Sequence, residues 1–104
     1  MADLARLTTF RRSNRGAATR LINTVNTFIA DATLSRTQLI HQLRRKIDSL
    51  ERKLTEIEEF DNHIFQLTAV ADLEAEVDKT DQTNQVIRDA RDNFEFRLTK
   101  MCIP

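Results

Sequence analysis

The fold is decided by residues 39–64, which read LIHQLRRKIDSLERKLTEIEEFDNHI. Apolar residues recur in this stretch at alternating spacings of three and four, the heptad pattern of a helix with one continuous apolar face. Such a face packs against another helix, because it would otherwise stay in water along its whole length. Asp61 is the one heptad position that breaks the pattern. The apolar heptad positions are Ile40, Leu43, Ile47, Leu50, Leu54, Ile57 and Ile64.

Composition favours one helical domain that covers residues 1–104. A chain of 104 residues has room for a single domain with a modest core. It contains one glycine and one proline, so almost nothing in it interrupts a helix. The net charge is zero, but the first half of the chain is basic and the second half acidic. This layout lets the chain fold back on itself or pair with a copy.

The single cysteine, Cys102, excludes an internal disulfide framework and is typical of a reducing compartment. No apolar run approaches the length of a signal-peptide core or of a membrane span. We therefore expect a cytoplasmic protein that has no membrane partner.

The pattern predicts an all-α fold with helices over residues 17–31, 35–67 and 72–101. Residues 35–38 read SRTQ, the form of a capping box, and Asp72 is expected to cap the third helix. Short connections favour antiparallel neighbours, which predicts an antiparallel three-helix bundle. The alternative is a helical hairpin with coiled-coil packing that buries its wide face against another chain. The helix-packing core is expected to comprise Leu21, Val25, Phe28, Ile40, Leu43, Ile47, Leu50, Leu54, Ile57, Ile64, Ile87, Phe94 and Leu98.

Residues 1–16 fit two interpretations, because they carry four arginines against one acidic residue. They are either the basic, solvated start of the first helix or an arm that binds nucleic acid. Under the second interpretation the candidate nucleic-acid contacts are Arg11, Arg12, Arg15 and Arg20.

Catalytic and metal-binding patterns are missing from the sequence. His41 and His63 are 22 residues apart at outer heptad positions, and no pair of His or Cys has the spacing of metal ligands. No glycine-rich loop is present to hold a phosphate. We therefore expect no enzymatic activity, no metal, no cofactor and no small-molecule substrate.

Three phenylalanines are candidates for an interface. Phe60 and Phe65 lie beside the apolar heptad face rather than on it, and Phe96 is expected to point outward. A two-stranded coiled coil would leave the first two rings in water, so a third helix or another chain must cover them.

Several spaced motifs follow one another along the chain. They are Arg15-Gly16-Ala17, Thr19-Arg20-Leu21-Ile22, Phe28-Ile29, then Leu43, Leu50-Glu51, Leu54 and Ile57-Glu58-Glu59-Phe60, and finally Phe94-Glu95-Phe96-Arg97-Leu98. This order resembles the N-terminal coiled-coil region of Gag-like polyproteins from BEL/Pao-type retrotransposons, over roughly residues 11–100. The usual aromatics near the end of the acidic helix are here phenylalanines, with no Tyr or Trp. The resemblance implies a fragment or a domesticated descendant that self-associates during capsid assembly.

Two functions stay open on the sequence. A structural self-association module would keep an apolar patch around Phe60, Phe65 and Phe96 after folding. A helical adaptor would use its arginine-rich N-terminus to bind nucleic acid or a partner protein, with these arginines gathered on one face.

Overall fold

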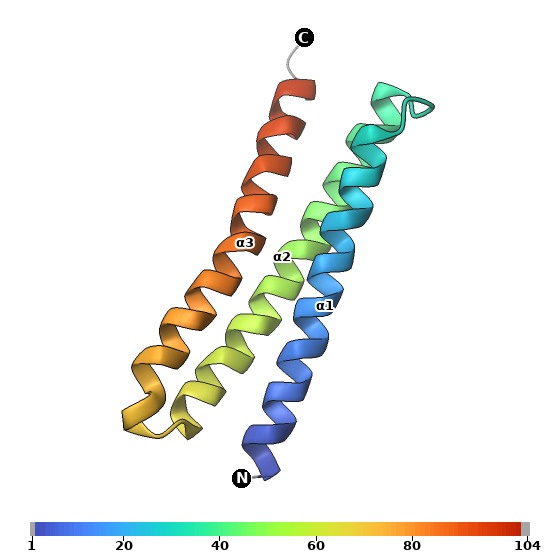
Figure 1. Cartoon of the computed structure of the whole chain (residues 1–104). Helices are drawn as coiled ribbons and strands as arrows, with labels where there is room; N and C mark the ends of the chain where they lie inside the picture. The colour runs from blue at the N-terminus through green and yellow to red at the C-terminus, as the bar shows by residue number, and fades with distance from the viewer. Residues whose placement is uncertain (1, 103–104) are drawn as a thin grey trace.

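Three long helices make up the part of the chain that the computed structural model describes, residues 2–102 (Figure 1). Helix α1 spans Ala2–Ala30, α2 spans Arg36–Leu67 and α3 spans Val70–Cys102. Helices α1 and α3 run in the same direction, and α2 runs opposite to both (Figure 1). No strand occurs among these residues. The all-α, antiparallel three-helix bundle predicted from the sequence is confirmed.

The connection between α1 and α2 is built from local hydrogen bonds. Asp31 accepts from the Thr33 backbone N–H at 2.9 Å and from its hydroxyl at 2.6 Å. These two bonds, the hydroxyl first, lower the pKa of the Asp31 carboxyl. The Ser35 hydroxyl accepts from the Gln38 N–H at 3.1 Å, and the Gln38 side chain accepts from the Ser35 N–H at 2.9 Å. The predicted capping box is therefore confirmed, with α2 beginning at Arg36.

Two helix starts differ from the expected bounds. Helix α3 begins at Val70, so Asp72 lies in its first turn and is not its N-cap. The predicted cap is wrong because helical structure resumes soon after Thr68, whose backbone is extended. The Asp72 N–H already donates a hydrogen bond to the Ala69 carbonyl. Helix α1 begins at Ala2, so the described part of residues 1–16 is helix rather than a non-helical arm. Packing against α2 stabilises this basic first part of α1 beyond its intrinsic helix propensity.

The core lies along α2, which packs against both other helices. Four of the expected core residues, Leu21, Phe28, Ile40 and Leu98, are only half-buried. Of these four, Leu21 and Leu98 still pack against the buried core from its edge. The expected core residues that are buried are Val25, Leu43, Ile47, Leu50, Leu54, Ile57, Ile64, Ile87 and Phe94.

Candidate functional site

Four buried polar residues, which we call the polar layer, join the three helices. Arg11 of α1, Asp61 of α2, and Thr80 and Asn84 of α3 are each at most 7% exposed. The Arg11 guanidinium donates to Asp61 Oδ1 at 3.1 Å and to the Thr80 hydroxyl at 3.3 Å. Asn84 Nδ2 donates to Asp61 Oδ2 at 2.7 Å. Each carboxylate oxygen of Asp61 thus has a partner from a different helix, which offsets the free energy of burying its charge.

Two further charges lie at the edge of the polar layer. Glu76 pairs with Arg11 at 2.8 Å, whereas Arg15 Nη2 lies 3.7 Å from Asp61 Oδ1, beyond hydrogen-bond distance. Arg15 Nε and Nη2 are buried and have no hydrogen-bond partner among the described residues. Burial, followed by the charge of Arg11, lowers the pKa of Arg15, while Asp61 and Glu76 act in the opposite direction. Arg15 is therefore a cation with unused hydrogen-bond donors.

The expected nucleic-acid contacts do not form one surface. Arg11 is buried and Arg15 is part-buried, and both face the polar layer. Only Arg12 and Arg20 of the four are exposed. The structure contradicts the prediction that Arg11 contacts nucleic acid, because its guanidinium is engaged with two carboxylates inside the bundle. Sequence patterns missed this pairing, since its partners lie 50 or more residues away.

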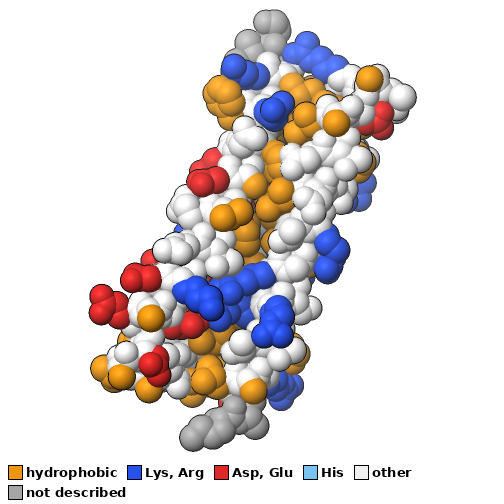
Figure 2. Space-filling view, in the orientation of Figure 1, with side chains coloured by type: hydrophobic (Ala, Val, Ile, Leu, Met, Phe, Trp, Pro, Cys, Tyr) orange, Lys and Arg blue, Asp and Glu red, His pale blue; other side chains and the backbone are white. Residues whose placement is uncertain are grey.

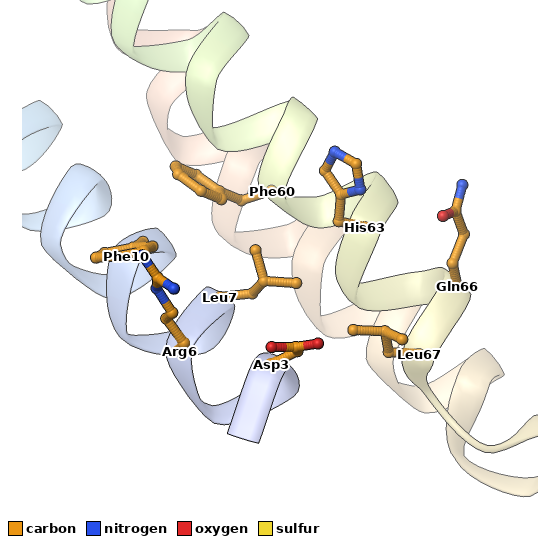
Figure 3. A pocket seen from close by; sticks show the side chains of 8 residues that line it. All are labelled: Asp3, Arg6, Leu7, Phe10, Phe60, His63, Gln66 and Leu67. Atoms are coloured by element: carbon orange, nitrogen blue, oxygen red, sulfur yellow. The ribbon is translucent and has the colours of Figure 1, made fainter. Parts of the chain in front are cut away.

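A hollow of about 420 Å³, which we call the end pocket, lies between the start of α1 and the end of α2 (Figure 3). Leu7 and Phe10 from α1 face Phe60 and Leu67 from α2 across it. The Phe10 and Phe60 ring centroids are 5.9 Å apart at a tilt of 42°, a favourable aromatic geometry. Phe10 is nevertheless 41% exposed and Leu67 50% exposed. The bundle thus leaves apolar surface uncovered at this end.

Polar side chains surround the end pocket. Asp3 and Arg6 stand on α1, and His63 and Gln66 on α2 (Figure 3). The Arg6 guanidinium carbon lies 5.3 Å from the Phe10 ring centroid, a cation–π distance. An apolar centre with a polar rim of both charge signs is the usual composition of a protein–protein interface.

A second uncovered surface, the α1–α3 groove, follows the opposite side of the bundle. Its lower hollow, about 350 Å³, lies between α1 and α3, and its upper hollow, about 210 Å³, also reaches α2. Figure 2 shows hydrophobic side chains along the strip between α1 and α3, with Lys and Arg near both ends. The lower hollow is lined by Arg15, Thr19, Ile22, Gln82, Thr83, Val86 and Ile87. The upper hollow is lined by Ile29, Leu39, Leu43, Arg97, Lys100 and Met101.

The three candidate interface phenylalanines lie in different surroundings. Phe60 is half-buried in the end pocket, and Phe65 is half-buried beside α3 at the outer edge of the polar layer. Phe96 is 58% exposed, with the Lys100 ammonium 4.6 Å from its ring centroid. They do not make one patch. Phe10 and Leu7 instead complete the surface around Phe60, and their spacing of three residues was the signal for it.

Within residues 2–102 no group of three His, Cys, Asp or Glu side chains is placed to hold a metal ion. No helix in that range has the combination of length and apolar character needed to cross a membrane. No protein-family model matches the chain, and no match was found among curated proteins or solved structures. The two uncovered surfaces are therefore the features on which a function can be based.

Proposed function

We propose that the chain is a non-catalytic structural module that associates with a second copy of itself through the end pocket. The observation that carries this proposal is the exposure of Phe10 and Leu67 around an apolar hollow. Fully burying an exposed side chain of this size contributes about 1.5–3 kcal/mol, and Phe10 and Leu67, which are already about half covered, contribute roughly half of that. Association through this end needs no rearrangement of the helices.

The charges on the rim of the end pocket favour a second copy as the occupant. Asp3 and Arg6 lie one helical turn apart on α1 and have opposite signs. In a two-fold symmetric contact each patch meets its own copy. When the two α1 starts pair antiparallel, Arg6 of one copy faces Asp3 of the other, and both apolar centres are covered.

The resemblance to Gag-like polyproteins gives this proposal its biological setting. The N-terminal region of those polyproteins self-associates during particle assembly, and we extend that role to this chain. A cytoplasmic location belongs to the same proposal and rests on the single cysteine, Cys102.

Sedimentation equilibrium over a concentration series, at low and high salt, tests self-association directly. We expect a mass above the 12.1 kDa of one chain, rising with concentration and persisting at high salt. Persistence at high salt follows from an apolar contact, because salt screens only the charges on the rim. A mass of one chain at every concentration would refute the proposal.

The interface is located by comparing Phe10→Ser with Phe96→Ser. Both residues are exposed phenylalanines on a helix, but only Phe10 lies in the end pocket. We expect Phe10→Ser to lower the average mass towards one chain while far-ultraviolet circular dichroism stays unchanged, and Phe96→Ser to leave the mass as it is. If Phe96→Ser dissociates the complex instead, the interface lies on α3 and the end pocket is not its site.

A further inference from the structure

The α1–α3 groove lies between two outer helices that pack much less against each other than against α2, and a polar contact joins them at the polar layer. There Arg11 of α1 reaches Thr80 and Glu76 of α3. Further along, apolar side chains line the space between α1 and α3 (Figure 2). Ile22, Ile29 and Met101 pack on the core from one side and line the groove on the other. A fourth helix in this position would complete a four-helix bundle.

The charged side chains that line the two hollows of the groove are all basic. Arg15 lines its lower hollow, and Arg97 and Lys100 line its upper hollow. No Asp or Glu among the described residues lines either hollow. The acidic side chains of α3 lie instead along its outer edge in Figure 2. An occupant therefore needs an apolar stripe along its middle and negative charges towards both ends.

Arg15 indicates which negatively charged group the occupant carries at the lower hollow. The Arg15 side chain lines the lower hollow and is 22% exposed, although Nε and Nη2 themselves are buried. The exposed part of the guanidinium therefore presents its positive charge to the groove. A carboxylate is the group that a guanidinium binds best.

We propose that the α1–α3 groove binds an amphipathic, acidic helix of a partner protein. Its apolar stripe covers Ile22, Val86 and Met101, of which Val86 is 66% exposed. One carboxylate binds Arg15, and another lies near Arg97 and Lys100. Arg15 and Ile29 lie 14 positions apart on α1, a span of about 21 Å, so the partner helix has about four turns with its carboxylates at opposite ends.

Two other occupants fit the groove less well. A second copy that packs groove against groove would bring Arg15, Arg97 and Lys100 against the same basic side chains. A nucleic acid offers phosphates to the basic ends, but it has no apolar side chains for the strip between them. The acidic helix satisfies both the apolar strip and the charges, by the helix-in-groove mode of recognition.

Fluorescence anisotropy with two synthetic peptides tests the proposal on the full chain. Both peptides are 18-residue helices with leucine at alternating spacings of three and four, and the remaining positions are glutamate in one and glutamine in the other. We expect the glutamate peptide to bind at least tenfold more tightly, with an affinity that falls as salt increases. Equal binding of the two peptides, or binding of neither, would overturn the proposal.

Arginine variants identify the groove as the binding site. Arg15→Gln and Arg97→Gln should each weaken binding of the glutamate peptide about tenfold, since each removes a hydrogen-bonded charge pair. Arg12→Gln is the matched control, because Arg12 is exposed on α1 and lines neither hollow. If Arg97→Gln and Arg15→Gln bind like Arg12→Gln, the peptide lies elsewhere. Displacement of the peptide by a single-stranded oligonucleotide would assign the groove to nucleic acid and equally overturn the proposal.

Discussion

Asp61 illustrates how one residue can interrupt an apolar pattern and still belong to the core. It is 3% exposed and accepts hydrogen bonds from Arg11 and Asn84. Asp61→Leu would restore the heptad pattern but remove the more deeply buried of the two carboxylates that pair with Arg11. Breaking a buried ion pair from one side is destabilising by about 3–5 kcal/mol. We expect urea unfolding of Asp61→Leu to show a loss of stability in this range.

The companion variant for this test removes both charges. Arg11→Met combined with Asp61→Leu removes both members of the buried ion pair, so part of the lost stability should return. Arg15 and Asn84 still lose Asp61 as a neighbour in the double variant. Glu76 then keeps water as a partner, since its side chain is 25% exposed. A double variant that is less stable than Asp61→Leu alone would mean that the layer is stabilising beyond its ion pair.

The environment of Glu95 predicts a pH dependence of the unfolding free energy. Burial, followed by a hydrogen bond that the protonated Glu95 carboxyl donates to Glu51 and by the charge of Glu51, raises the pKa of Glu95 above its ordinary value. A carboxyl whose pKa is raised by folding stabilises the fold when protonated, and this contribution is lost as pH rises through the raised pKa. Glu95→Gln should therefore raise the unfolding free energy at pH 7 by a few tenths of a kcal/mol, because solvent screens the pair.

Thermal unfolding of Glu95→Gln and of the unchanged chain at pH 7 and at about pH 3 measures this effect. At about pH 3 the glutamate is largely protonated in both states, so the two proteins should unfold at nearly the same temperature. A stabilisation that is equally large at both values of pH would contradict an electrostatic origin.

At the scale of the elements, α2 could be predicted closely, and the polar layer could not. The heptads of residues 39–64 depend only on local spacing, which is why α2 was found nearly to the residue. The start of α1 was ambiguous because Arg11 occupies a position where a helix face should be apolar. Its partner Asp61 likewise occupies an apolar position of the heptad pattern in α2. Only the folded arrangement brings Arg11 and Asp61 together.

The same long-range limit applies to the candidate surfaces. Phe60 was predicted to be a candidate interface residue from its place beside the heptad face. The ring that packs against it, Phe10, lies on α1, a different helix. The α1–α3 groove depends on how far two non-consecutive helices diverge, a quantity that no local pattern contains. Sequence periodicity therefore finds which faces are apolar, but not which of them stay uncovered.

The N-cap of α2 is a feature of one element that can be tested by itself. Ser35→Ala removes the hydroxyl that accepts from the Gln38 N–H. Loss of such a cap lowers stability by about 1 kcal/mol, which urea unfolding measures. Ser13→Ala is the matched control, since Ser13 is exposed within α1 and the change should be neutral or slightly stabilising. Equal effects of the two substitutions would show that the cap contributes nothing.

At the scale of the whole molecule, the two uncovered surfaces are separate and share no residue. The end pocket lies between α1 and α2, whereas the groove lies between α1 and α3. The polar layer ties the three helices together between these surfaces. The two proposed contacts therefore do not compete for the same residues.

Separate surfaces predict additive effects on thermal stability. A contact made only by the folded chain raises the melting temperature with the concentration of the partner. For self-association we expect an increase of a few degrees per tenfold increase in protein concentration, which Phe10→Ser should abolish. The glutamate peptide should raise the melting temperature of the unchanged chain and of Phe10→Ser by the same amount. A peptide effect that disappears in Phe10→Ser would mean that both partners use the end pocket, because only a shared surface couples the two contacts in this way.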